Sequence, residues 1–137
     1  MISVISNIVP RAVAEMVRAA LASEWEEAAR FEAALRPLFA LVTVRVDEQT
    51  RHGPVQFRAR NPLPIKTMMG ILGMPGGPCR RPLGRMTRRS ITVVLNVLRE
   101  VWKNSPEILR PIEGAFDVSI ERRLSQNDWS SLTYDEY

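Results

Sequence analysis

Residues 61–73 read Asn-Pro-Leu-Pro-Ile-Lys-Thr-Met-Met-Gly-Ile-Leu-Gly, and they form the most informative segment of this 137-residue chain. Its two prolines suit the first turn of a helix, because the N–H that proline lacks would have no partner there. Asn61 is therefore the predicted cap. Apolar residues then recur at helical spacing, and Gly73 is a typical helix stop. The segment predicts a helix whose apolar positions are Ile65, Met68, Met69 and Leu72.

Helical periodicity continues on both sides of this segment. One helix is predicted over residues 10–21, and a longer one over residues 23–42, with Pro37 inside it as an expected kink. Thr87 is the predicted cap of the longest helix, and shorter helices are predicted after Pro106. The chain is therefore predicted to be mainly α.

Two segments have strand character. Ile2 to Ile5 is a short β-branched run, which predicts a strand that has no partner within reach. Residues 43–60 alternate apolar and polar side chains around Arg51-His52-Gly53-Pro54, which predicts a small hairpin.

Three segments, taken in order, carry a resemblance to a known family. They are Ile2 to Arg11, then Asn61-Pro62-Leu63-Pro64-Ile65-Lys66, and then Arg81-Pro82-Leu83 ahead of a capped helix. Together they resemble the last third of the dihydrodipicolinate synthase and N-acetylneuraminate lyase family, whose signature reads Asn-Pro-Ile-Pro-Val-Lys. The chain departs from the family in two places, because residues 43–60 are longer than the usual connection and the tail extends beyond Asn104.

This resemblance implies a piece of a larger fold. Family members are (β/α)8 TIM barrels with a helical carboxy-terminal appendage, and their active sites lie at the carboxyl ends of the strands. Residues 1–103 would then hold the last barrel strand and helix plus the carboxy-terminal helical bundle. Residues 104–137 would add a short helical extension and an acidic, flexible tail.

The family's chemistry implies a pyruvate-dependent lyase of the class I aldolase type. A lysine forms a Schiff base with pyruvate and a tyrosine relays protons, and both belong to upstream strands. Lys66 matches a helix-start lysine that is not the Schiff-base residue. No catalytic residue is therefore expected, and the chain is expected to be a fragment or subunit that is inactive alone. In a completed barrel, Ile2 and Asn7 are the candidates to contact pyruvate.

Two other functions stay open. The chain could be the complementing half of a split lyase, whose partner would be the missing amino-terminal barrel half. The other expected partner is a second copy of the chain, in a homo-oligomer. It could also be an arginine-rich helical module for polyanions, because residues 45–89 hold ten basic and two acidic residues. The favoured interpretation is intramolecular neutralisation by the acidic residues 104–137, so nucleic acid is not the expected partner. The anion-binding candidates are Arg80, Arg81, Arg85, Arg88 and Arg89.

Composition excludes several kinds of site. Cys79 is the single cysteine, which excludes an internal disulfide and fits a reducing cytoplasm, the expected location. With His52 as the single histidine, a structural zinc site is not expected, and the resemblance implies neither a metal nor a cofactor. The chain has no apolar run long enough to span a membrane.

Overall fold

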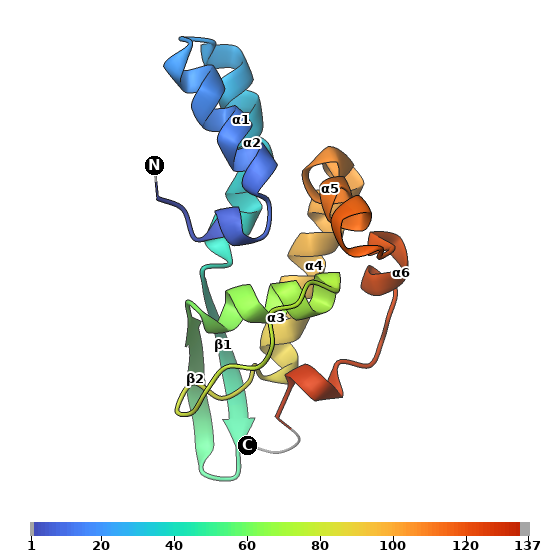
Figure 1. Cartoon of the computed structure of the whole chain (residues 1–137). Helices are drawn as coiled ribbons and strands as arrows, with labels where there is room; N and C mark the ends of the chain where they lie inside the picture. Colours follow the sequence, from blue (N-terminus) through green and yellow to red (C-terminus); the bar gives the residue numbers. More distant parts are fainter. Residues whose placement is uncertain (1, 135–137) are drawn as a thin grey trace.

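The computed structural model describes residues 2–134, in which helices predominate and the two strands form one antiparallel hairpin (Figure 1). The prediction of a mainly α chain is confirmed. No helix within this range is long and apolar enough to cross a membrane. The elements, in chain order, are α1 (Pro10–Leu21), α2 (Trp25–Ala40), β1 (Thr43–Thr50), β2 (Gly53–Arg60), α3 (Leu63–Leu72), α4 (Arg88–Asn104), α5 (Pro106–Phe116) and α6 (Ile120–Leu124), with 3₁₀ turns at Ile5–Asn7 and Ser130–Leu132.

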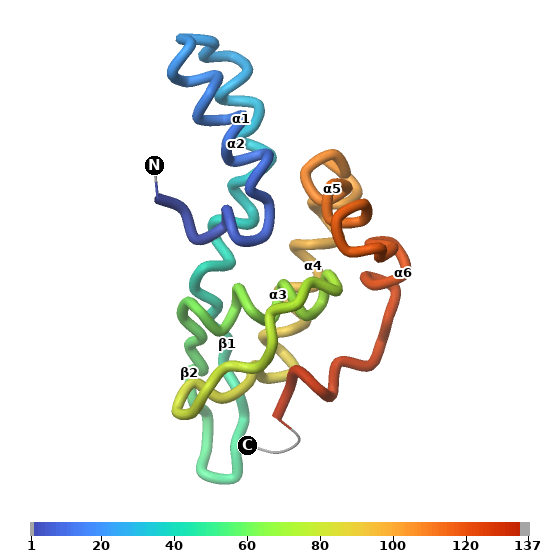
Figure 2. The backbone as a smooth tube through the Cα atoms, viewed as in Figure 1, coloured from blue at the N-terminus to red at the C-terminus, as the bar shows by residue number. Residues whose placement is uncertain are grey.

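The helix α4 lies at the centre of the fold and contacts β1, α2, α3, α5 and α6 (Figure 2). It is amphipathic, because its apolar side chains recur every three or four positions and so form one stripe. This stripe is buried and joins the separate elements into one core. Its members are Ile91, Val94, Leu95, Leu98 and Val101.

The cap of α4 is the one predicted from the sequence. Thr87 is buried, and its Oγ1 accepts a hydrogen bond from the Ser90 backbone N–H at 3.2 Å. We expect Thr87→Ala to lower the free energy of unfolding by about 1–2 kcal/mol, because the N–H at the helix start loses its acceptor. Urea unfolding measures this. Thr92→Ala is the matched control, since the exposed Thr92 caps nothing, and its effect should stay within about 0.5 kcal/mol.

Two arms project from this centre in opposite directions (Figure 1). The helices α1 and α2 pack against each other to form one arm. The strands β1 and β2 form the other, so the hairpin predicted at residues 43–60 is confirmed.

The register of the hairpin assigns each strand residue to a face. Pairing runs from Thr43 opposite Arg60 to Thr50 opposite Gly53. Successive side chains alternate between faces, and directly opposite residues share a face. Val44 and its partner Ala59 are buried on the inner face, on the side where β1 meets α4. The other face points to solvent.

Two local predictions are wrong. Residues 2–4 have no strand, and Ile5–Asn7 form a 3₁₀ turn with Ile5 buried. A strand needs a neighbour to pair with, and both described strands pair with each other. Asn61 is not the cap of α3, because Pro62 holds that position and the Asn61 N–H is bonded to the Val42 carbonyl, where it extends the hairpin ladder.

The carboxy-terminal segment packs against the body as far as residue 134. Trp129 and Thr133 are buried, and Thr133 forms an isolated parallel bridge with Met86. The Tyr134 N–H donates to the Met86 carbonyl at 3.2 Å. The sequence predicts a polar, frayed end from Gln126, whereas residues 126–134 fold back onto the segment before α4. Residues 135–137 lie outside the described residues.

Candidate functional site

Ile2 and Asn7, the residues expected to contact pyruvate, lie at the amino-terminal end of the described chain. The Ile2 side chain is fully exposed. Asn7 lies in the first 3₁₀ turn, where its Nδ2 donates to the Val4 carbonyl at 2.9 Å. Neither residue lines any of the three clefts described here. Their role stays a prediction, because it depends on neighbouring barrel strands.

The largest of these clefts, about 1010 Å³, lies between α3, the α3–α4 loop and the tail. Lys66 of α3, Arg81 and Arg85 of the loop, and Tyr134 of the tail line its walls. The Lys66 Nζ donates to the Pro78 carbonyl at 3.0 Å. The lysine thus ties the start of α3 to the loop, which is a structural contact.

The five candidate anion-binding arginines are distributed over several surfaces. Arg81 and Arg85 share the large cleft, and Arg85 also donates from Nη1 to the Thr133 carbonyl at 3.2 Å. Arg80 is exposed and lines none of the three clefts. Only two of the five guanidinium groups therefore line one cleft.

Arg88 and Arg89 open α4 and face different neighbours. Arg88 lines a separate cleft of about 420 Å³ together with Trp129. Arg89 turns to the hairpin, where its Nη1 donates to the Asp47 carbonyl at 3.1 Å and its Nε lies 3.6 Å from Glu48 Oε2. Arg89 therefore fastens α4 to β1.

Glu48 is a buried acid that sequence reasoning missed. It lies on the inner face of the hairpin, and its Oε1 has no hydrogen-bond partner in the described part of the chain. The strand alternation that places Val44 and Val46 inward also predicts Glu48 inward. A buried carboxylate is costly without a partner, so the Arg89 contact has a structural role.

The outer face of the hairpin carries a group of three arginines. They were counted from the sequence only as part of the basic residues 45–89 and were not identified as a group. Arg45 lies directly opposite Arg58, and Arg60 follows two residues later on the same face. All three are exposed. Partial desolvation of the guanidinium by its neighbours lowers the pKa of Arg58 most, and the charges of Arg45 and Arg60 lower this pKa further. The predicted hairpin contained this signal, but only the register makes the two arginines neighbours.

Arg123 of α6 joins three elements. Its Nε donates to the Ile71 carbonyl at 2.8 Å and its Nη2 donates to the Gly70 carbonyl. Its guanidinium also lies 5.4 Å from the centre of the Trp129 ring. Arg123 therefore satisfies carbonyls at the end of α3 and holds the tail through Trp129.

The side chains with reactive or metal-binding potential are scattered over the described part of the chain. Within residues 2–134, no group of three or more His, Cys, Asp or Glu side chains could hold a metal ion. His52 lies in the hairpin turn beside Arg51, Cys79 lies in the α3–α4 loop, and Lys103 is exposed in the last turn of α4. Cys79 also lines the large cleft, together with Lys66, Arg81 and Arg85. The chemistry that these surfaces offer is the binding of anions by positively charged side chains.

Comparison with known proteins agrees with the resemblance. The family model for the dihydrodipicolinate synthetase family matches residues 1–100. The chain is 32% identical over 100 residues to a 4-hydroxy-tetrahydrodipicolinate synthase of Methanocaldococcus jannaschii, which covers 73% of this chain and 30% of that protein. Proteins of the same name from Methanococcus maripaludis and Acetivibrio thermocellus are 34% and 28% identical over 100 and 99 residues, and cover 73% and 72% of this chain.

The chain spans about 30% of the length of these curated relatives, since the matches cover 30% of the Methanococcus maripaludis protein and 29% of the Acetivibrio thermocellus protein. No solved structure matches it significantly. The match to the family model nevertheless covers most of the chain, including the Asn61–Lys66 segment and the capped helix that follows it. On this evidence, the chain belongs to the dihydrodipicolinate synthetase family.

Proposed function

We propose that this chain supplies the carboxy-terminal helical part of a pyruvate-dependent, Schiff-base-forming lyase, and that it is inactive until barrel strands carrying the reactive lysine join it. The observation that carries the proposal is the family match over residues 1–100, which accounts for only 30% of the length of a relative. Further residues of the same polypeptide or a separate chain can supply the strands.

The placement of the two lysines supports this proposal. A Schiff-base lysine needs an unprotonated amine held beside the substrate carbonyl, in a site that excludes water. The Lys66 Nζ is engaged by the Pro78 carbonyl, and Lys103 is exposed. Tyr134, on the rim of the large cleft, packs against Gly84. Its side chain fills the space that any larger residue at position 84 would need. The Lys66 amine therefore already has a backbone partner, and Lys103 lines none of the three clefts.

Borohydride trapping tests the proposal. Borohydride reduces a Schiff base to a stable amine, so pyruvate remains attached to any lysine that condensed with it. We expect no pyruvate adduct on the purified chain by mass spectrometry. When the chain is mixed with, or fused to, the amino-terminal barrel half of the Methanocaldococcus jannaschii relative, we expect an adduct on a lysine of the added half.

The two arms of this experiment separate the alternatives. An adduct that forms on mixing supports a complementing half, whereas one that forms only in the fusion supports a covalently continuous enzyme. Lys66→Arg combined with Lys103→Arg is the matched control, and it should leave the adduct unchanged. An adduct on either lysine in the chain alone would refute the proposal, and so would inertness of both the mixture and a folded fusion.

A further inference from the structure

The outer face of the β1–β2 arm is an exposed surface rich in arginine. Arg45 and Arg58 are directly opposite across the strands, and Arg60 follows on the same face. Directly opposite side chains on a sheet have Cβ atoms about 5 Å apart, and like charges placed so are destabilising. The other side chains of this face are one carboxylate, Asp47, the uncharged polar Thr43, Gln49 and Gln56, and Pro54, so the net charge of the face is +2.

None of these three arginines forms an ion pair among residues 2–134, although one acid, Asp47, lies on the same face two positions from Arg45. Glutamates pair instead with arginines elsewhere, among them Arg18, Arg30, Arg36 and Arg89. Partial desolvation of the Arg58 guanidinium lowers its pKa most, and repulsion from Arg45 and Arg60 lowers this pKa further. The tail, which the sequence predicts to lie on the basic region, contacts the loop end of that region at Gly84, Arg85 and Met86 as far as Tyr134, and does not pair with the three hairpin arginines. An anion on this face would relieve the repulsion.

We infer that the outer face of the β1–β2 arm binds the phosphate backbone of double-helical nucleic acid. Eight-residue strands span about 27 Å, and a two-stranded ribbon fits the DNA major groove, which is about 12 Å wide. Arginine suits phosphate because its planar fork donates two parallel hydrogen bonds. Gln49 and Gln56 add side-chain amides of the kind that contact base edges.

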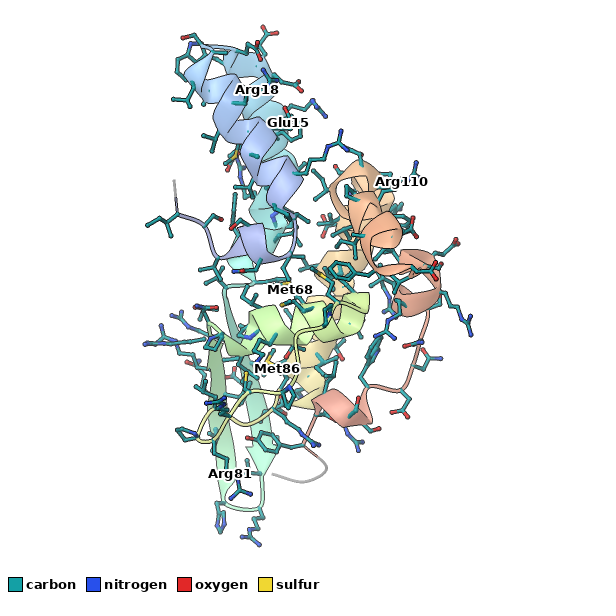
Figure 3. All side chains as sticks on the ribbon, viewed as in Figure 1. Glu15, Arg18, Met68, Arg81, Met86 and Arg110 are labelled. Atoms are coloured by element: carbon teal, nitrogen blue, oxygen red, sulfur yellow. The ribbon has the colours of Figure 1, made fainter. Side chains whose placement is uncertain are left out.

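The shape of the molecule leaves this ribbon accessible. The arm extends from the helical body at the end opposite the tip of α1 and α2 (Figure 1). Figure 3 shows polar side chains extending from the hairpin away from the core, which Met68 marks. Val55, near the turn, is half exposed although it belongs to the inner face, so the distal part of the arm extends past the packed core. A rigid duplex can approach this end without displacing a helix.

The composition of the face disfavours other partners. It has no large apolar side chain, whereas a protein interface core or an interfacial membrane contact needs one. It has no aromatic platform, which single-stranded recognition uses. Arg45, Arg58 and Arg60 line none of the three clefts described above and lie on an exposed strand face, which suits an extended polyanion.

Fluorescence anisotropy with the full chain and a short labelled duplex of mixed sequence tests the inference. We expect binding that weakens steeply between roughly 50 and 200 mM salt. The triple variant R45Q/R58Q/R60Q should bind at least about tenfold more weakly at low salt. The slope of log affinity against log salt should fall in magnitude by about 2.7, because each phosphate contact contributes about 0.9.

A matched control removes the same charge elsewhere. R18Q/R30Q/R36Q deletes three arginines that pair with glutamates on α1 and α2, and it should leave the slope unchanged. Thermal unfolding verifies folding, and the hairpin variant should melt no lower than the parent, because it loses repulsion. The inference uses no residue of the lyase proposal, so each can fail alone.

Four outcomes would overturn the inference. They are absence of salt-dependent duplex binding, equal slopes for the two triple variants, equal affinity for a single strand of the same length, and equal affinity for polyglutamate or anionic lipid vesicles. Tighter binding to duplex than to these probes, lost only in R45Q/R58Q/R60Q, supports it.

Discussion

Leu98→Ala is expected to lower the free energy of unfolding by about 3–5 kcal/mol. Leu98 is completely buried in α4, the helix that contacts β1, α2, α3, α5 and α6. Truncation removes the burial energy of three carbons and leaves a cavity that several fixed elements surround, so collapse around it is limited. Domains of this size are stable by about 5–15 kcal/mol, and the variant should therefore unfold at much lower urea concentration.

Two other variants of α4 are the controls for this prediction. Leu98→Met conserves volume and should cost less than about 1.5 kcal/mol. Val93→Ala removes atoms from a partly exposed position and should change stability by about 0.5 kcal/mol or less. If Leu98→Ala and Val93→Ala destabilised the chain equally, α4 would not be the centre of the core.

Arg123→Met is expected to cost about 2–4 kcal/mol and to release the tail. The methionine keeps much of the aliphatic stem but cannot donate to the Ile71 and Gly70 carbonyls at the end of α3. Hydrogen bonds from charged groups contribute about 1.5–3 kcal/mol, and the contact with the Trp129 ring adds about 0.5–1 kcal/mol. Hydrogen exchange at the Tyr134 amide, which is bonded to Met86, measures release of the tail, and urea unfolding measures the total.

Arg122→Met is the control for this prediction. Arg122 is the exposed neighbour of Arg123 on α6, and its substitution by methionine removes the same charge. Its substitution should change stability by about 0.5 kcal/mol or less and leave Tyr134 protected. Equal acceleration of exchange in the two variants would show that net charge, and not the Arg123 contacts, holds the tail.

The helices and the hairpin could be predicted because their signals are local. The spacing of Val94, Leu98 and Val101 on α4, the cap at Thr87 and the stop at Gly73 each depend on neighbours in sequence, and the structure bears them out. The strand predicted at Ile2–Ile5 failed for the opposite reason, because β-branched residues become a strand only when another strand offers hydrogen bonds.

The candidate site was harder to predict because it depends on distant pairings. Arg123 contacts carbonyls more than fifty positions earlier, and no pattern in the sequence links them. The opposition of Arg45 and Arg58 depends on register, since a slip of one residue would put the two arginines on opposite faces and turn one of them to the core. The five arginines predicted to bind anions are close in sequence, but loop geometry and α4 direct them to different neighbours.

The bridge between Met86 and Thr133 has a mechanical consequence. Two backbone hydrogen bonds, Met86 N–H to Leu132 O and Tyr134 N–H to Met86 O, join the tail to the entrance of α4. A pulling force applied at the carboxyl end would load these two bonds first, and α4, α5 and α6 would bear no tension until they broke. The bridge thus protects the three helices from a force applied at the carboxyl end.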